Sequence, residues 1–218
     1  MCANLLVLAS ASPRRRALLL RLGLEHTVVP AALDESAYRG ATPQETTARI
    51  AAAKALAVDG RGSIVVAADT AVVLEGEVLG KPANTAEATV MLRRLRGRWH
   101  RVLTALAVRG AGGALHLDVV ATEVLMRPYS EGEIAAQVAS GEALDKAGAY
   151  GAQQPGFRPV ARIRGCYQNV VGLPLCHLCR RLEQEGVVLP STPPPHCRRD
   201  LGQECPVSLY PIAQALVL

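Results

Sequence analysis

The feature that most limits how this chain can fold is its alternation of short apolar runs with signals that start helices. Residues 5–9 form a continuous apolar run, which is typical of a buried strand. Ser12 then precedes Pro13, an N-cap residue followed by the residue best suited to the first helical position. A second continuous apolar run at residues 64–68 indicates a central strand. This alternation predicts an α/β fold rather than a helical bundle or a β-sandwich.

Other segments predict hairpins and more helices, so we expect a long mixed sheet with flanking helices. Three pairs of β-rich runs are joined by short turns: residues 72–74 with 77–79, 102–108 with 114–126, and 160–163 with 167–171. A short strand is expected at residues 26–30, and further helices are expected to begin near Thr42, Thr85, Ser130 and Pro174. Thr42 and Ser130 are each followed three residues later by Glu, which is the spacing of a capping box.

Length and composition favour one compact domain followed by a different tail. The chain has 218 residues, of which half are apolar, and this suits a single core. Its apolar runs are much shorter than the ~20 residues that cross a bilayer, and no charged lead of a signal peptide precedes the first run. Six of the 14 prolines fall in the last 29 residues. We therefore expect a cytoplasmic protein with one domain over residues 1–189, a proline-rich tail over residues 190–218 and no membrane partner.

Basic residues outnumber acidic ones and gather in three segments. The chain has 24 Lys and Arg against 19 Asp and Glu, a net charge of +5, and the clusters lie at residues 14–21, 93–101 and 158–181. Such clusters favour anionic ligands, above all phosphate. The second cluster ends a predicted helix, where cations suit the dipole, so a solvated face is the simpler interpretation there. Only 3% of the residues are aromatic, which argues against a stacking surface for a nucleic-acid polymer.

The most informative segment runs from Ser10 through Ser12 to Arg14 and Arg15. It joins a predicted strand to a helix whose first turn carries two cations. Cations at a helix N-terminus oppose the helix dipole, and such a local conflict often marks a functional site. The free N–H groups of the helix and two guanidinium forks would suit a chain of phosphates. The alternative is a capped surface helix with arginines placed by chance.

Two further segments carry groups that suit phosphate chemistry. Asp69 directly follows the run at residues 64–68, so we expect it at the carboxyl end of a strand, where α/β sheets place ligands. There it could bind a divalent metal or accept a proton from water, although a loop-capping Asp is the plain alternative. Lys81 lies between Gly80 and Pro82, so a rigid loop would present its charge to a phosphate. Taken alone, this segment favours an ordinary solvated lysine.

The segment from Asp145 to Gln153 is rich in small residues. Gly148 and Gly151 would let the backbone approach a ligand closely. Gln153 offers both a donor and an acceptor, which suits reading the edge of a base.

The cysteines leave a metal site open. Cys176 and Cys179, taken with His196 and Cys197, have part of the spacing of a zinc site. The chain has no second Cys-x-x-Cys pair, however, and reduced thiols are common in cytosolic proteins. A metal-binding interaction module built on these residues therefore stays as an alternative.

Taken together, the segments resemble the Maf family of nucleoside triphosphate pyrophosphatases, also called septum formation inhibitor Maf. Several motifs in one order carry the resemblance, and together they reach from residue 5 to about residue 186: residues 5–15, Lys54, residues 68–70, 80–82, 91–97, 100–108, 145–153 and 169–175. A departure follows Gln153, where Gln154-Pro155-Gly156 replaces the glycine that the family often has next.

The resemblance implies a fold, a reaction and a set of site residues. The fold would have two lobes around a cleft, similar to the inosine triphosphate pyrophosphatases. The reaction would cleave a nucleoside triphosphate between its α and β phosphorus atoms, with Mg²⁺ or Mn²⁺ as cofactor. By the match, Asp69 would accept the proton of the attacking water, and Glu35 and Asp69 would hold the metal. The substrate would be bound by Ser10, Ser12, Arg14, Arg15, Lys54, Thr70, Lys81 and Gln153.

The resemblance also points to a substrate. Arg14, Thr70 and Gln153 match the positions that set base choice in the branch acting on dTTP and UTP. We therefore expect hydrolysis of dTTP and UTP, with modified pyrimidine triphosphates as further candidates, in a house-cleaning role. A 7-methyl-GTP pyrophosphatase of the same family and a non-catalytic, nucleotide-binding regulator of septum formation remain the alternatives. The oligomeric state stays open, with a homodimer as one option.

Overall fold

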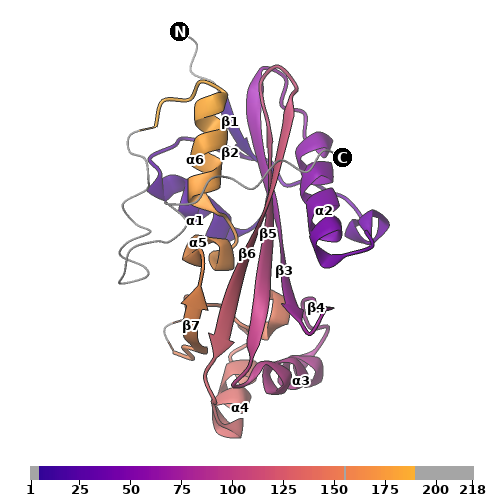
Figure 1. Cartoon of the computed structure of the whole chain (residues 1–218), viewed down its shortest axis with the longest axis vertical. Helices are drawn as coiled ribbons and strands as arrows, with labels where there is room; N and C mark the ends of the chain where they lie inside the picture. Colours follow the sequence, from indigo (N-terminus) through magenta and orange to yellow (C-terminus); the bar gives the residue numbers. More distant parts are fainter. Residues whose placement is uncertain (1–4, 155, 190–218) are drawn as a thin grey trace.

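A seven-stranded mixed sheet with helices on both faces forms the protein, as Figure 1 shows. The computed structural model describes residues 5–154 and 156–189. The strands are β1 (Leu5–Leu8), β2 (Thr27–Val28), β3 (Ser63–Leu74), β4 (Glu77–Leu79), β5 (Trp99–Arg109), β6 (Leu115–Met126) and β7 (Val160–Arg164). Their order is β2-β1-β3-β5-β6-β7, with β4 added to β3. The predicted α/β class with a long mixed sheet is confirmed.

The helices surround two ends of this sheet. They are α1 (Pro13–Arg21), η1 (Glu35–Tyr38), α2 (Pro43–Ala57), α3 (Thr85–Leu95), α4 (Glu131–Ala139), η2 (Ala147–Ala149), α5 (Tyr167–Val171) and α6 (Leu175–Gln184). In Figure 1, α1, α2 and α6 surround the upper half of the sheet, and α3 and α4 close its lower end. The long antiparallel strands β3, β5 and β6 run through both halves and join the two lobes. Among the described residues, no helix is long and apolar enough to span a membrane.

The core is buried on both faces of β3, which explains why the sequence of this strand is so continuously apolar. Val65 and Ala67 pack with alanines of α2 on one face. Ile64 and Val66 pack with leucines of α1 and α6 on the other. A separate group of apolar side chains from β3, α3, β5 and α4 fills the lower lobe. Strands covered on both faces lose the usual alternation of apolar and polar residues.

The position of Asp69 corrects the sequence analysis. Residues 64–68 and 72–74 are parts of one strand, β3, and Asp69 and Thr70 lie in its middle, opposite Ala105 and Thr104 of β5. The expected strand end after residue 68 is wrong because β5 continues to pair along that edge. On the opposite edge, β1 pairs with β3 only as far as Val66, and the pairing with β4 begins at Val72. Asp69 therefore lies beside the carboxyl end of β1, at a gap in the sheet edge.

The predicted third hairpin is also wrong. After β7 the chain forms the short helix α5 instead of a returning strand. The side-chain amide of Asn169, in α5, is buried and donates to the carbonyl oxygen of Val102 and to Oγ1 of Thr122, both at 3.0 Å. Gly172 ends the helix with a φ of 120°, a conformation that favours glycine. These tertiary contacts of the Asn169 amide N–H groups outweighed the local β-propensity of the apolar residues.

Helix caps follow the sequence with one difference. Ser130 and Glu133 form the complete predicted capping box at the start of α4. Thr42 caps α2 through the N–H of Glu45, but the Glu45 carboxylate accepts from the N–H of Ala41 rather than from Thr42. The second half of that box is thus displaced by one residue.

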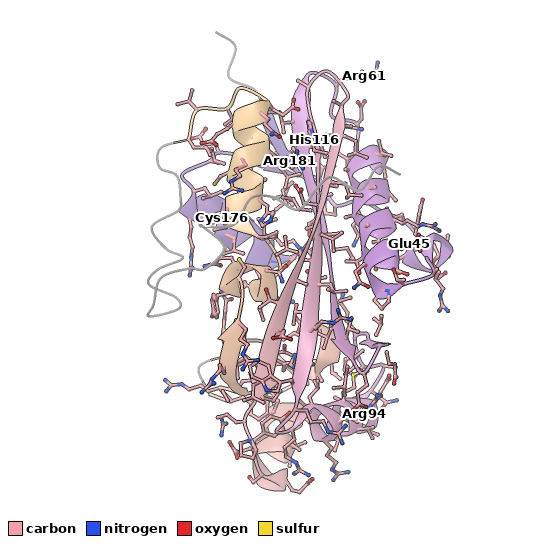
Figure 2. All side chains as sticks on the ribbon, in the orientation of Figure 1. Glu45, Arg61, Arg94, His116, Cys176 and Arg181 are labelled. Atoms are coloured by element: carbon pink, nitrogen blue, oxygen red, sulfur yellow. The ribbon has the colours of Figure 1, made fainter. Side chains whose placement is uncertain are left out.

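The two later arginine clusters divide into separate ion pairs. Arg93 and Arg96 both bind Glu131 and join α3 to α4 on the surface, as expected for a solvated face. In the third cluster, Arg181 of α6 forms a buried, two-pronged pair with Asp118 of β6, at 2.7 and 2.8 Å. Arg164 instead lies over the ring of Trp99. Figure 2 shows Arg94 in the lower half of the molecule and Arg181 in the upper half, so these two arginines do not share one anion site.

Candidate active site

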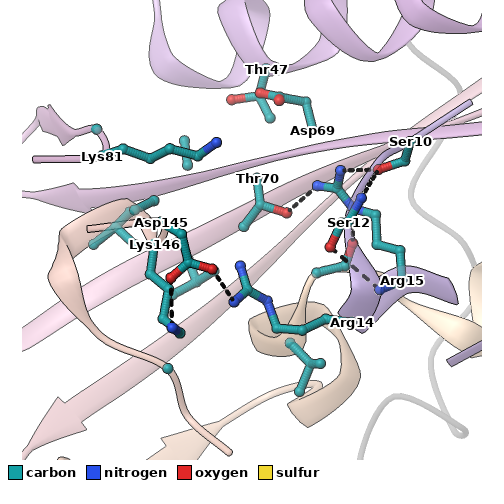
Figure 3. Close-up of a pocket in the computed structure, with 18 of the residues that line it drawn as sticks. Ser10, Ser12, Arg14, Arg15, Thr47, Asp69, Thr70, Lys81, Asp145 and Lys146 are labelled. Carbon is teal, nitrogen blue, oxygen red and sulfur yellow. Dashed lines mark hydrogen bonds and ion pairs between the residues drawn. The ribbon is translucent and has the colours of Figure 1, made fainter. Parts of the chain in front are cut away.

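One cleft of about 1000 Å³ brings together all ten of the site residues expected from the sequence. It opens beside the unpaired edge of β3, between the two lobes, and Figure 3 shows its walls. The residues that share this cleft are Ser10, Ser12, Arg14, Arg15, Glu35, Lys54, Asp69, Thr70, Lys81 and Gln153. They come from segments up to 143 residues apart in the chain, which only the folded sheet brings together.

A carboxylate held by an ammonium group occupies one wall. The Asp69 side chain points to the face covered by α2, and the Nζ of Lys54 lies 2.9 Å from its Oδ1. The same ammonium lies 2.8 Å from Oε1 of Glu35, on η1. The side chains of Lys54 and Asp69 are only 12% and 15% exposed, whereas that of Glu35 is 54% exposed. Lys54 therefore fixes the Asp69 carboxylate at the border between the core and the open cleft.

The N-terminus of α1 forms the adjoining wall, as the sequence predicts. Ser12 is its N-cap, and no acidic residue lies in the first turn of the helix. The guanidinium of Arg15 donates to Oγ of Ser10 at 3.1 Å, to Oγ1 of Thr70 at 3.0 Å and to the carbonyl oxygen of Gly172 at 2.9 Å. Burial lowers the pKa of Arg15, and the charge of Asp69 partly opposes that shift. Arg15 remains a cation, since arginine keeps its charge in proteins.

Arg14 is the more open of the two arginines. Its side chain is 36% exposed, and its Nη1 lies 3.7 Å from Oδ2 of Asp145. The carboxylate of Asp145 also accepts from Nζ of Lys146 at 2.6 Å. Figure 3 shows this pair below Thr70 and shows the Lys81 amine pointing into the cleft from the loop after β4. Within the described part of the chain, Lys81 forms no ion pair, so its charge faces the cavity.

The far end of the cleft is built from residues 147–154. Gly148 has a φ of 68°, and a Cβ there would lie 3.1 Å from a methyl group of Val72, so the turn accepts only glycine. The Tyr150 hydroxyl lies 2.6 Å from Nε2 of the buried His100. Gln153 is exposed at the cleft, as a residue that reads a ligand would be.

Sequence reasoning missed the residues that hold this end in place. Gln154 is buried, and its Oε1 accepts from the N–H of Gly151 at 3.0 Å and from Nε2 of Gln137 at 3.1 Å. Its own amide donates to Glu142. In the sequence, Gln154 stands out only as a departure from the family pattern. Two adjacent glutamines give no local signal of which side chain will be buried.

The cysteines that suggested a metal lie elsewhere. Cys176 and Cys179 are buried thiols on α6, and burial raises the pKa of Cys179 to about 12. In residues 5–154 and 156–189, no group of three or more His, Cys, Asp or Glu side chains is arranged to hold a metal. His196 and Cys197 fall outside the described residues.

The geometry suits a highly charged, elongated anion. Four cationic side chains, Arg14, Arg15, Lys54 and Lys81, converge on a cavity that also holds one well-anchored carboxylate. Cations placed where charge develops on a leaving group stabilise the transition state of phosphoryl transfer. A carboxylate beside them can accept a proton from water.

Comparisons with known proteins agree on one family. The family model described as Maf-like protein matches residues 5–185. A "dTTP/UTP pyrophosphatase" of Thermomicrobium roseum is 49% identical over 206 residues, 93% of this chain and 94% of that protein. A protein of the same name from Anaeromyxobacter sp. is 50% identical over 189 residues, 85% of this chain and 91% of its own.

Among solved structures, the chain aligns with a "Nucleoside-triphosphatase / dITP/XTP pyrophosphatase" of Mycobacterium abscessus. The identity is 16%, the TM-score is 0.43, and the alignment covers 82% of this chain and 96% of that one. The family model and the sequence relatives each span most of the chain and agree with each other. The chain therefore belongs to the Maf family.

Proposed function

We propose that this protein hydrolyses dTTP and UTP to the corresponding monophosphate and pyrophosphate. The observation that carries the proposal is the Asp69 carboxylate, fixed by Lys54 in a cleft that Arg14, Arg15 and Lys81 also line. The names of the relatives supply the substrates, since proteins about half identical over most of this chain are called dTTP/UTP pyrophosphatases. These names favour dTTP and UTP over the alternative of 7-methyl-GTP, and the intact carboxylate favours an enzyme over a non-catalytic regulator.

The roles of the side chains follow from their positions. Asp69 accepts a proton from the water that attacks the α-phosphorus; the bond from that phosphorus to the bridging oxygen breaks, and pyrophosphate leaves. Arg14, Lys54 and Lys81 bind phosphate oxygens and balance the charge that grows on the leaving group. Ser10, Ser12 and the free N–H groups of α1 extend this cradle. Arg15 supplies its charge from behind, because three of its N–H groups already bind protein oxygens.

The donor set in the cleft fits a Mg²⁺ or Mn²⁺ cofactor. Mg²⁺ is usually held by one or two carboxylates together with substrate phosphates and waters. Asp69 and Glu35 both contact the Lys54 ammonium, so their two carboxylates are close neighbours at the cleft. A metal bound there would polarise a phosphoryl oxygen and neutralise developing charge. We propose Glu35 and Asp69 as its protein ligands.

We further propose that residues 1–189 make up the enzyme domain and that the enzyme acts on nucleotides in the cytoplasm. The matched family model ends at residue 185, close to the proposed boundary. The buried thiols of Cys166, Cys176 and Cys179 suit a reducing compartment.

A hydrolysis screen tests the proposed function. Purified protein is incubated with dTTP, UTP, CTP, ATP, GTP and 7-methyl-GTP, with Mg²⁺ or Mn²⁺, and both pyrophosphate and phosphate are measured. We expect pyrophosphate, without phosphate, from dTTP and UTP. Asp69→Asn should fold normally, as judged by circular dichroism and thermal unfolding, and lose about 10³-fold or more in kcat, in the range for loss of a general base. Near-normal hydrolysis by this variant would remove Asp69 from the chemistry, and phosphate as the first product would refute the cleavage site.

A further inference from the structure

A chain of hydrogen bonds links the cleft to the interior through two threonine hydroxyls. Nη2 of Arg15 lies 3.0 Å from Oγ1 of Thr70, which lies 2.9 Å from Oγ1 of Thr104. Thr104 lies directly opposite Thr70 on β5 and is wholly buried. Its Oγ1 in turn lies 2.9 Å from the carbonyl oxygen of Asn169. Each of the four groups comes from a different element: α1, β3, β5 and α5.

The two ends of this series of hydrogen bonds determine which group donates and which accepts in each bond. A guanidinium can only donate and a carbonyl oxygen can only accept. Thr104 therefore uses its one hydroxyl proton on Asn169, so it can only accept from Thr70. Thr70 must donate to Thr104 and accept from Arg15. Its hydroxyl proton points into the protein, and the only capacity that Thr70 Oγ1 has left for a ligand is that of an acceptor.

A glycine backbone lies beside this oxygen at the cleft. Gly172 passes close to it: a Cβ on that residue would lie 3.5 Å from Oγ1 of Thr70 and 3.6 Å from Nε of Arg15. Gly172 also accepts the Nε–H of Arg15 and has a φ of 120°, so a side chain there would strain the backbone. Thr70 therefore lines the cleft with its hydroxyl oxygen fixed as an acceptor.

An acceptor of fixed direction selects its ligand. Phosphate oxygens are acceptors themselves and gain nothing at Thr70. The imide N3–H of uracil and thymine is a donor, whereas the N3 of cytosine is an acceptor and would leave two acceptors facing each other. A sugar hydroxyl can turn to donate or to accept, so a fixed acceptor would not distinguish nucleotides by it. Unlike a freely rotating hydroxyl, this oxygen discriminates between the two kinds of pyrimidine.

We propose that Thr104 is a specificity-determining positioning residue: by fixing the Thr70 hydroxyl as an acceptor, it makes the cleft select the N3–H of uracil and thymine over cytosine. The inference rests on the proposed function, because it concerns the base of that substrate. To that function it adds Thr104, the residue that makes the Thr70 hydroxyl an acceptor, and the hydrogen-bond direction that excludes cytosine.

The test compares Thr104→Val with Thr104→Ser. Valine keeps the shape but removes the hydroxyl, which frees the Thr70 proton to turn toward a ligand. Serine keeps the hydroxyl and serves as the matched control. The ratio of kcat/KM for UTP to that for CTP is measured for each. We expect this ratio to fall by about 10-fold or more in Thr104→Val, mainly through the KM values, and to stay near that of the unsubstituted protein in Thr104→Ser. A purely structural role would lower both substrates equally and leave the ratio unchanged, which would overturn the inference.

A second variant keeps the inference testable if Thr104→Val fails to fold. Thr70→Val removes the acceptor itself, and it should lower kcat/KM for UTP by about 10-fold or more while changing CTP much less. An equal loss on both substrates would count against the inference. If the unsubstituted protein hydrolyses UTP and CTP equally well, the inference fails and the pyrophosphatase function stands. If it releases pyrophosphate from no nucleotide, the proposed function itself fails.

Discussion

Mild acid should destabilise this protein through one buried imidazole. His100 is 4% exposed, its Nε2 lies 2.6 Å from the Tyr150 hydroxyl, and the two rings meet edge to face. Burial lowers the pKa of His100 from 6.5 to about 4. Burial also raises the pKa of Tyr150, so the tyrosine keeps its proton and donates it to the neutral imidazole. The pair fixes the tyrosine at the far end of the cleft, near Gln153 in the chain.

The sign and size of the effect follow from these pKa values. Above pH 6.5 the imidazole is neutral in both the folded and the unfolded protein, so the full stability is present. Between pH 6.5 and 4 the unfolded protein binds a proton that the folded protein does not, so the free energy of unfolding falls as the pH falls. For a shift from 6.5 to about 4, the loss between pH 7 and pH 5 is roughly 2 kcal/mol.

Urea unfolding at pH 7, 6 and 5, followed by circular dichroism, measures this loss. Other groups also titrate in this range, and burial lowers the pKa of His177 in the same direction. The comparison is therefore made with His100→Gln, whose amide can still accept from Tyr150 but does not titrate. We expect the unsubstituted protein to lose about 2 kcal/mol more than the variant between pH 7 and pH 5. Equal losses in the two proteins would refute the argument that His100 is buried in its neutral form.

Two other predictions concern specificity and stability. Gln153→Ala should change the preference among UTP, dTTP and CTP more than it changes kcat on the best substrate, because the Gln153 side chain lies exposed at the cleft. An unchanged substrate profile in the hydrolysis screen would show that Gln153 does not recognise the base. Arg181→Met should lower the free energy of unfolding, measured in urea, by about 3–5 kcal/mol, because it leaves the buried carboxylate of Asp118 unpaired. The double variant Asp118→Leu with Arg181→Met should recover much of that loss, because it removes the buried charge as well. If the double variant is less stable than Arg181→Met, an unpaired buried charge is not the cause.

Local chemistry made much of the fold and the site predictable. The N-cap of Ser12 before Pro13 fixed the start of α1, and the pairing of Ser130 with Glu133 fixed the start of α4. Such interactions lie within one turn of helix, so the sequence alone displays them. Cations in the first turn of α1 were likewise visible as a conflict with the helix dipole, and they line the cleft.

What the sequence could not show depends on partners far along the chain. Asp69 follows an apolar run that looks like the end of a strand, but the pairing of β5 carries β3 past it. Residues 167–171 have the composition of a strand, but the buried amide of Asn169 and its partners on β5 and β6 hold them as a helix.

The sequence by itself determined the alternation of strands and helices, the cationic character of the α1 N-terminus and the identity of the residues that meet in the cleft. The first two depend on interactions between neighbours in the chain, and the third depends on sequence motifs that resemble those of the family. The tertiary structure decided which way they face. Asp69 and Thr70 are adjacent in sequence, yet the alternation of the strand turns one toward Lys54 and the other toward Arg15 and Thr104. The pleat of the strand puts the carboxylate and the threonine hydroxyl on opposite faces, but the groups that orient them come from α1, α2 and β5 and meet only in the folded protein.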